Sequence, residues 1–362
     1  MQTPIRCSLM RGGSSKGLYF RREDLPTDEG LRDRVLVAAM GSDSRQIDGA
    51  GGAHPLTSKV AIVSRSESKD ADVDYLFVQV VVGEGRVDTT PNCGNMLAGV
   101  GPFAIEQGIV PASDGETAVR VRMLNSDNLC ELLVQTPGKR VRYDGDAHID
   151  GVPGTSAPIV CNYLDVAGSA TGSLLPTGRA LDVVDGVDVT CIDNGMPVVV
   201  LRARDLGVSG YETPQDLEKN KELKARVESI RLQIGPKMNL GDVTKKVVPK
   251  MALIAPARAG GHVCTRTFIP HDVHAAIGVL GAVSVATACI LPGSAAQGIA
   301  TVPEGRVKRM SVEHPTGEFS VTLEVGGTRE QPKVLKAGLL RTARLIMRGE
   351  VLVPADVWDG AR

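Results

Sequence analysis

The chain lacks the features by which proteins bind nucleic acids or anionic membranes through a broad electrostatic surface. Its 362 residues include 41 lysines and arginines against 42 aspartates and glutamates, which gives a formal net charge of −1. Aromatic residues make up only 3% of the chain and leave few rings for stacking on bases. Neither a nucleic acid nor a membrane is an expected partner, so an anionic substrate must be bound by a local group of charges.

Long apolar segments and paired cysteines are also missing. The N-terminal segment 1–13 has no apolar core of the kind that a signal peptide needs. The most apolar segment, 279–293, is too short to span a bilayer. The cysteines number seven, and no two of them form a CxxC pair. This pattern is typical of reduced thiols rather than of a disulfide framework or a zinc site, so we expect a cytoplasmic protein.

The chain repeats one order of segments in its two halves. Each half reads as strand, Gly turn, strand, helix, strand, strand and a helix of small apolar residues. Two halves of similar fold are therefore expected, with the N-termini of two buried helices facing one cleft, where they can bind an anion. The matching segments are 6–20 and 189–201, 22–42 and 211–235, 55–63 and 247–255, 74–82 and 261–269, and 92–108 and 274–290.

Local signals define several elements of this repeat. Thr213 is a suitable N-cap for the helix predicted in 211–235, and Pro214 suits its first helical position. The glycine- and proline-rich segment 137–180 leads to a linker expected near 178–188. The C-terminal segment LLRTARLIMRGEVLV is ambiguous between helix and strand, because its periodicity fits both.

The stretch TTPNCGNMLAGVG, residues 89–101, places Cys93 where a turn enters a buried helix. At such a position the free N–H groups of the first turn, those of Gly94 and Asn95, and the positive end of the helix dipole favour a thiolate. A proton-transfer role and a plain buried core cysteine both fit this pattern.

The segment MRGGSSKG has the composition of an anion-binding turn. Its glycines let the backbone N–H groups of Ser14 and Ser15 approach an anion, and Arg11 can act as a bidentate carboxylate clamp. An exposed arginine in an ordinary turn is the alternative. Neither this segment nor GAGG at 49–52 matches GxGxxG or GxxxxGK[ST], so a nucleotide site is not expected.

Seven motifs in order resemble the PrpF family of carbon–carbon double-bond isomerases, within the diaminopimelate-epimerase-like superfamily. The resemblance runs from about residue 5 to the end, and the pattern is most similar to that of the 4-oxalomesaconate tautomerases. The segment 123–128 departs from it, since MLNSDN stands where those enzymes read close to MENTGQ. The motifs are MRGGSSKG, QIDGAGGAHPLTSKVAIV, NCGNMLAGVGPFA, IDNGMPVVV, MNLGD, RTFIPHDVHAAIG and HPTGEF.

The resemblance implies an α+β fold of two pseudo-symmetric epimerase-like domains, each a curved mixed sheet around a central apolar helix, with the active site in the cleft between them. The expected domains are 1–182, with 338–362 as a candidate additional strand, and 183–337. The epimerases use one cysteine from each half. Here Cys93 matches the first, Gly278 aligns with the second, and Met196 replaces a polar side chain.

The activity implied is a 1,3-proton shift in an unsaturated oxo-tricarboxylic acid, with Cys93 and Lys59 as the catalytic pair and without a metal or organic cofactor. The residues do not determine which of the two abstracts the proton, and a lysine that extends to the surface is the alternative for Lys59. The expected substrate is 4-oxalomesaconate, and 2-methylaconitate and methylitaconate are the alternatives.

Three basic residues near the second buried helix complete the expected substrate site. Arg266, His271 and His274 lie at the end of a strand and in the loop before that helix, where we interpret them as carboxylate binders. A His-x-x-His spacing without a third ligand does not predict a metal site. A racemase is opposed by the missing second cysteine, and a polycarboxylate-binding protein without activity is the alternative outside enzymes. The sequence leaves the oligomeric state open, with a homodimer as the working hypothesis.

Overall fold

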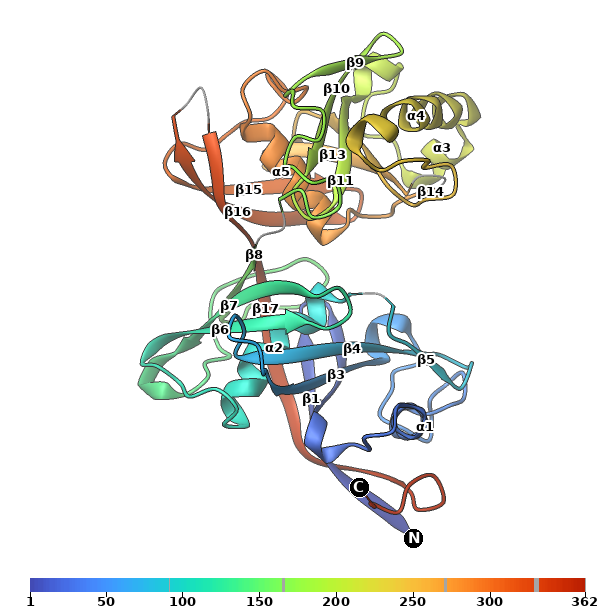
Figure 1. The fold of residues 1–362 in the computed structure, drawn as a ribbon, viewed down its shortest axis with the longest axis vertical. Coiled ribbons are helices and arrows are strands. Elements are labelled where there is room, and N and C mark those ends of the chain that lie inside the picture. Colours follow the sequence, from blue (N-terminus) through green and yellow to red (C-terminus); the bar gives the residue numbers. More distant parts are fainter. Residues whose placement is uncertain (91, 165–166, 270–271, 329–331, 362) are drawn as a thin grey trace. The chain divides into compact units, whose positions relative to one another are not determined.

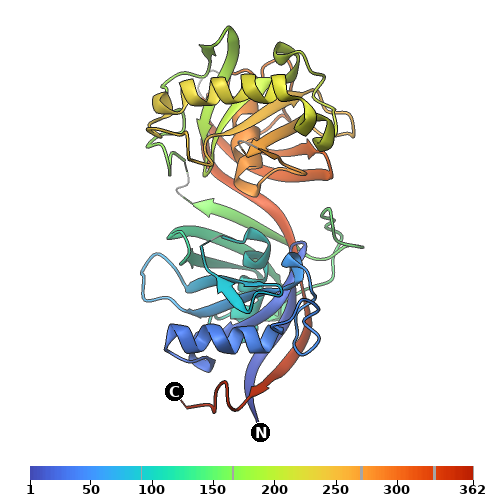
Figure 2. The same ribbon diagram turned by 90° about the vertical axis from the view of Figure 1, so that its right-hand side faces the viewer.

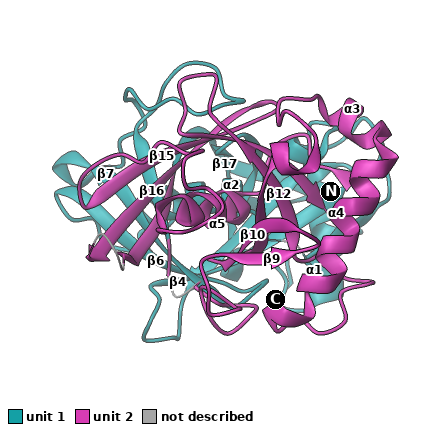
Figure 3. Ribbon diagram, turned by 90° about the horizontal axis from the view of Figure 1, so that it is seen from above, with its two compact units in different colours: residues 1–162, 340–362 teal, residues 163–339 magenta. Residues whose placement is uncertain are grey.

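The strand pairs and buried helices expected from the sequence are present in the computed structural model, which describes residues 1–90, 92–164, 167–269, 272–328 and 332–361. The chain divides into two compact units, Met1–Asn162 with Leu340–Arg362, and Tyr163–Leu339 (Figure 3). The first boundary thus precedes the division at 182/183 drawn from the sequence, and the C-terminal segment belongs to unit 1.

Unit 1 is a curved mixed sheet around one helix. The helix α2 (Gly94–Glu106) contacts six strands of the sheet, and α1 (Glu29–Met40) packs on the outer face (Figure 1). Short 3-10 turns are η1 (Arg22–Asp24), η2 (Pro55–Thr57) and η3 (Pro137–Lys139). The strands are β1 (Gln2–Gly12), β2 (Ser15–Arg21), β3 (Lys59–Arg65), β4 (Val73–Val81), β5 (Arg86–Asp88), β6 (Gly115–Met123), β7 (Asn128–Thr136) and β8 (Pro158–Leu164).

Unit 2 repeats this plan. Its central helix is α5 (Val279–Ile290), and α3 (Pro214–Lys219) and α4 (Lys221–Ile234) replace α1. The outer helices α1 and α4 are the blue and yellow helices of Figure 2. Short turns are η4 (Ala203–Leu206) and η5 (Pro236–Met238). The strands are β9 (Asp182–Val184), β10 (Val187–Asp193), β11 (Pro197–Arg202), β12 (Lys250–Ala255), β13 (Val263–Ile269), β14 (Asp272–Val273), β15 (Val307–His314), β16 (Gly317–Gly327) and the first part of β17 (Pro332–Pro354). From Leu340 on, β17 belongs to unit 1.

Strand directions confirm that the halves share one topology. In unit 1, β2 runs parallel to β3, β3 is antiparallel to β4, and β4 runs parallel to β6. In unit 2, β11, β12, β13 and β15 follow the same sequence of directions. The two parallel pairs of each unit are linked through helices, as parallel pairing requires a crossover connection.

The central helix of unit 1 is buried because its residues are apolar and small. Met96, Leu97 and Phe103 are at most 2% exposed, and full burial of such a side chain contributes about 1.5–3 kcal/mol. Gly99 is required by close packing, since a Cβ there would lie 2.4 Å from the hydroxyl of Tyr19. That hydroxyl donates to the carbonyl of Met96 at 2.6 Å and so ties β2 to the first turn of the helix.

Local predictions are confirmed where the signal is within one element. Thr213 is the N-cap of α3 and accepts from the Asp216 N–H, and Pro214 is its first residue. The single helix expected in 211–235 is divided, because the side chain of Asn220 caps a second helix by accepting from the Leu223 N–H.

Two segments required information from elsewhere in the chain. The ambiguous C-terminal segment is a strand, since Gln2–Gly12 of β1 pairs with 343–354 of β17. The linker expected near 178–188 was wrong, because β9 and β10 form a hairpin there. Its turn, Asp185–Gly186, has two positive φ angles of 54° and 72°, which is the geometry that favours two-residue hairpins.

Candidate active site

Cys93 is the N-cap of α2, as the sequence predicts for a turn that enters the buried helix. Its carbonyl accepts the N–H of Leu97 at 3.0 Å and the hydroxyl of Tyr75 at 3.3 Å, which fixes the backbone of the residue. The residue is 9% exposed, and within the described part of the chain its Sγ takes no hydrogen bond. The thiol therefore lies at the positive end of the helix dipole without a partner that would hold its proton.

Lys59 is the first residue of β3, and only 8% of its surface is exposed. Its Nζ donates to Oε1 of Gln79 at 2.8 Å and lies 4.8 Å from the ring centroid of Phe77. No aspartate or glutamate oxygen of the described residues forms an ion pair with it. The amine is thus held by a neutral amide and by an aromatic face rather than by a counter-charge.

Register places Lys59 and the support of Cys93 on one face of one sheet. Lys59 pairs with Gln79. Phe77 and Tyr75 lie two and four residues before Gln79 on β4. Side chains at i, i+2 and i+4 of a strand share a face, so these three point to the side that α2 covers. Tyr75 contacts Cys93 and Phe77 contacts Lys59, and the whole run spans about 13 Å of strand.

The β1–β2 turn packs against the start of α2. The side chain of Asn95 donates to Oγ of Ser14 at 3.2 Å, and a Cβ at Gly13 would lie 2.2 Å from the Asn95 side-chain oxygen. Oγ of Ser15 is buried and has no hydrogen-bond partner among the described residues. Together with the backbone of Gly94, these groups gather polar hydrogens at the end of the helix where an anion is stabilised.

Arg11 is engaged by its own unit. One guanidinium nitrogen donates to the carbonyl of Gly13 and to both the carbonyl and the hydroxyl of Thr342, at 2.9 to 3.1 Å. The other terminal nitrogen donates to Oγ of Ser156 at 3.1 Å. These contacts tie β1 to β17 and account for the arginine as a structural residue, so its predicted role as a carboxylate clamp stays a prediction.

In unit 2, Gly278 is the N-cap of α5, the position that Cys93 has on α2. The turn before β11 is fixed to this helix, because Oγ of Ser284 donates to the carbonyl of Met196 at 2.7 Å and accepts from the N–H of Asn194. Met196 therefore contacts the middle of the helix that Gly278 caps. The two halves differ chemically at this point, with a thiol in unit 1 and no side chain in unit 2.

His274 and Lys250 form the basic group of unit 2. Nδ1 of His274 accepts the N–H of Ala276 at 2.9 Å, which leaves Nε2 as the free position of the ring. Burial, and then the charge of Lys250, lower the pKa of His274. Burial, followed by the charge of Arg231, lowers the pKa of Lys250. A lysine and a histidine whose protonation that lysine opposes form a candidate site for a carboxylate.

Removing the charge of Lys250 is expected to raise the pKa of His274. A positive neighbour disfavours the imidazolium, so its loss in Lys250→Met makes protonation easier, whereas the burial that also lowers this pKa remains. NMR titration of the ring protons, with His274→Gln to assign the signal, measures the change. The exposed Lys69→Met is the control, and an unchanged or lower pKa in Lys250→Met would contradict the pairing.

The remaining predicted binders are separate from this group or not described. Arg266 donates from Nε to the carbonyl of Glu212 at 2.6 Å, and from one terminal nitrogen to the carbonyl of Thr265 and to Sγ of Cys264. It is 8% exposed and ties β13 to the segment before α3, so its role as a carboxylate binder stays a prediction. His271 lies outside the described residues.

Three further residues hold Lys59 and the turn of Cys93, the predicted catalytic pair: Tyr75, Gln79 and Asn125. Asn125 accepts the N–H of Phe77 and donates to the carbonyls of Phe77 and Thr89, at 2.7 to 2.9 Å. It therefore fastens β4 to the loop that carries Cys93 and gives the segment 123–128 a structural role. Pairing the strands 55–63 and 74–82 as a hairpin would have pointed to Gln79, the polar residue opposite Lys59.

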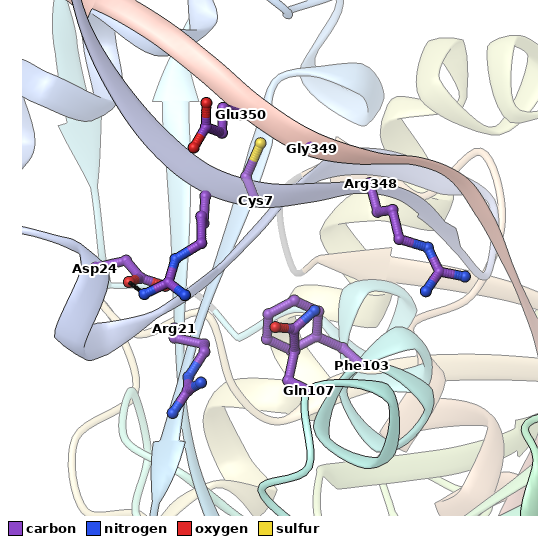
Figure 4. A pocket seen from close by; sticks show the side chains of 9 residues that line it. Cys7, Arg21, Asp24, Phe103, Gln107, Arg348, Gly349 and Glu350 are labelled. Atoms are coloured by element: carbon purple, nitrogen blue, oxygen red, sulfur yellow. Dashed lines mark hydrogen bonds and ion pairs between the residues drawn. The ribbon is translucent and has the colours of Figure 1, made fainter.

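A separate cavity of about 340 Å³ lies in unit 1 beside the C-terminal half of α2 (Figure 4). Arg6 pairs there with Asp24 at 2.8 Å, and burial raises the pKa of the Cys7 thiol to about 11. Phe103 and Gln107 line it from the helix end opposite to Cys93, so it is distinct from the candidate site.

Over the described parts of the chain, no group of three or more His, Cys, Asp or Glu residues is arranged to hold a metal ion. No helix in those parts is long and apolar enough to cross a membrane.

Comparisons with known proteins identify the family of this chain. The family model described as PrpF protein matches residues 2–354. A 4-oxalomesaconate tautomerase of Pseudomonas putida is 57% identical over 360 residues, covering 99% of each chain. A (4E)-oxalomesaconate Delta-isomerase of Novosphingobium sp. is 60% identical over 348 residues, covering 96% of this chain and 97% of that protein.

Among solved structures, a methylitaconate-delta-isomerase superposes with a TM-score of 0.87 at 34% identity, covering 98% of this chain and 97% of that one. The likeness extends over both units, which confirms the predicted epimerase-like α+β architecture of two similar halves. With a family model that matches almost the whole chain and relatives at 57% and 60% identity, this protein belongs to the PrpF family.

Proposed function

We propose that this protein is a cofactor-independent isomerase that moves a proton between two carbons of 4-oxalomesaconate. The observation that carries the proposal is the arrangement of Lys59 and Cys93, an amine without a counter-charge and a thiol at a helix N-terminus, on the α2 side of one sheet. Two such groups, one to remove a proton and one to return it, are what a 1,3-proton shift requires.

The proposed reaction keeps atoms and electrons in balance. Lys59 removes a proton from the saturated carbon next to the C=C bond of the substrate, and the electron pair of that C–H bond forms a new C=C bond. The original double bond shifts toward the carbonyl oxygen, which takes the negative charge of a dienolate. Cys93 then donates its proton at the other end of the allylic unit, where an electron pair of the dienolate forms the new C–H bond as the C=O bond is restored. This leaves a thiolate and an ammonium, which exchange protons with water before the next turnover.

The start of α2 is suited to stabilise the dienolate. The N–H groups of Gly94 and Asn95 belong to the first turn and have no acceptor within the helix, and the Asn95 side chain is held by Ser14. Donors fixed in advance toward a developing oxyanion contribute most of the rate in many enzymes, roughly 10²–10³-fold for a single donor. Lys250 and His274 form a basic group within unit 2, which we propose to be a carboxylate site.

Relatives support 4-oxalomesaconate over the alternatives. The two relatives named for oxalomesaconate are 57% and 60% identical to this chain, whereas the methylitaconate isomerase is 34% identical. The seven buried, unbridged cysteines fit a reducing compartment, and we propose a cytoplasmic location. A homodimer remains our hypothesis for the assembly, which light scattering on the purified protein would test.

Turnover in deuterated water tests the proposal. The purified protein should isomerise 4-oxalomesaconate with a kcat/KM roughly 10²-fold or more above that for 2-methylaconitate or methylitaconate, because a missing polar group leaves binding groups unpaired. NMR should show deuterium at the carbon that receives the proton. A higher kcat/KM for one of the other acids would reassign the substrate within the family. Binding of all three acids without turnover would favour a polycarboxylate-binding protein.

A further inference from the structure

The side chain of Gln79 is fixed more firmly than a surface glutamine. Its Nε2 donates to the carbonyls of Pro55, Ser58 and Val80 at 3.1, 3.0 and 3.2 Å. Because the amide nitrogen faces these three acceptors, the amide oxygen must face the other way, where it accepts from Nζ of Lys59 at 2.8 Å. The direction of the amide is thus set by the backbone and not by the lysine.

The segment that leads into Lys59 is fastened to the same network. Oγ of Ser58 donates to Oε1 of Gln46 at 2.5 Å and to the carbonyl of His54 at 2.9 Å. Gln46 is 2% exposed, has a φ of 49°, and accepts the N–H of Ala53 at 2.9 Å. A non-glycine residue in this backbone region costs of order 1–3 kcal/mol and persists only where neighbouring contacts hold it. The backbone on either side of the Lys59–Gln79 pair is therefore held in place.

The chemical character of the partner is as informative as its position. A carboxylate at this distance would favour the protonated amine through its charge, and Lys59 forms no ion pair with any described acid. An amide oxygen accepts a hydrogen bond from both the ammonium and the free amine, so it supports either state. The ring of Phe77 on another side restricts where the Nζ can lie.

We propose that Gln79 is a positioning residue, which aims the Nζ of Lys59 while leaving the amine free to lose and regain its proton. This inference rests on the proposed role of Lys59 as a base. It explains why a buried lysine at the start of a strand is paired across the strands with a glutamine rather than with a glutamate.

Two substitutions separate the positioning of the Lys59 amine from the effect of a charge beside it. In Gln79→Glu, the limb of the pH profile of kcat that reports the base should move to higher pH by about one unit or more, and kcat at neutral pH should fall roughly tenfold for each unit. Gln79→Met keeps the length of the side chain but removes the acceptor. Its kcat should fall while its KM stays within about twofold of wild type, since the Lys59 amine is no longer positioned but the substrate contacts are kept. The exposed Gln233→Glu carries the same change of charge on α4 and should alter neither value.

A merely structural glutamine would give a different result. Both variants would then lose thermal stability and lower kcat equally at every pH, and the profile of Gln79→Glu would keep its wild-type position. That outcome overturns the proposal. If Gln79→Glu does not fold, Gln79→Met with its split between kcat and KM decides, and an unchanged kcat in that variant overturns the proposal as well.

A measurement without substrate keeps this test separate from the proposed activity. Lysines labelled with 13C at Cε report their own protonation by NMR, and the signal missing from Lys59→Met identifies Lys59. The titration midpoint of that signal should be higher in Gln79→Glu than in wild type and unchanged in Gln233→Glu. If the protein turns over none of the acids but this shift is present, the proposed function fails and the positioning role stands. If turnover is normal and the midpoint is the same in Gln79→Glu, only the positioning role fails.

Discussion

Lys59→Met is expected to lower kcat by roughly 10²–10⁴-fold, the range that general acid–base groups contribute. Methionine has nearly the length of the lysine stem and is apolar, so it can occupy the space over Phe77 without a charge to bury. Its main structural cost is the loss of the hydrogen bond to Oε1 of Gln79, about 1–3 kcal/mol for a buried acceptor left unpaired. The change should therefore act on chemistry far more than on folding, as kcat and thermal unfolding together will show.

The matched control for this substitution is Lys69→Met, in an exposed loop of the same unit. It removes the same charge away from the sheet face that α2 covers and should leave kcat unchanged. In deuterated water, Lys59→Met should also lose exchange at the carbon from which the proton departs. If Lys59→Met keeps more than about one tenth of the wild-type kcat, the loss is smaller than removal of a catalytic base should cause, and that role is contradicted.

The sequence predicted those features that depend on neighbouring residues. The order of segments in the halves was readable because each strand and helix carries its own periodicity, and the cap position of Cys93 follows from a turn that precedes an apolar run. The structure shows the same strand directions in both units and places Cys93 and Gly278 at equivalent caps. Such features can be predicted from the sequence because the residues that determine them are close together in the chain.

Features that depend on distant partners were not predictable from the sequence in the same way. Arg11 meets Thr342, which lies 331 residues along the chain, and nothing near Arg11 in the sequence announces that acceptor. The C-terminal segment fitted both helix and strand, and its pairing with β1 decides for strand. The Asp185–Gly186 turn is different, because its signal is local: an Asp-Gly pair is typical of a two-residue hairpin. The glycine- and proline-rich composition of the preceding segment was given more weight and led to the prediction of a linker.

The two halves of the repeat differ at their helix caps, and this difference bears on the choice between racemisation and a proton shift along a carbon chain. A racemase needs an acid and a base on opposite faces of one carbon, and the resemblance to the epimerases implies that they carry their two thiols at the positions of these caps. Here the second cap is Gly278, and the second proton carrier is proposed to be Lys59, which belongs to the same unit as Cys93. Proton removal and return by a strand residue and a helix cap of the same unit suit two carbons of one substrate better than two faces of one carbon.

Cys93→Ser is expected to lower kcat by roughly 10²–10⁴-fold while the protein folds as well as before. Serine is among the preferred N-cap residues, so the helix should lose nothing and can gain about 0.5–1 kcal/mol where the hydroxyl accepts an N–H of the first turn. An alcohol gives up its proton far less readily than a thiol does, so the return of the proton should fail. In deuterated water this variant should still exchange the proton that Lys59 removes, whereas Lys59→Met should not.

The control is Cys7→Ser, which changes a buried thiol beside the other half of α2 and should keep the wild-type kcat. Loss of exchange at both carbons in Cys93→Ser would instead make the cysteine the base and reverse the proposed roles.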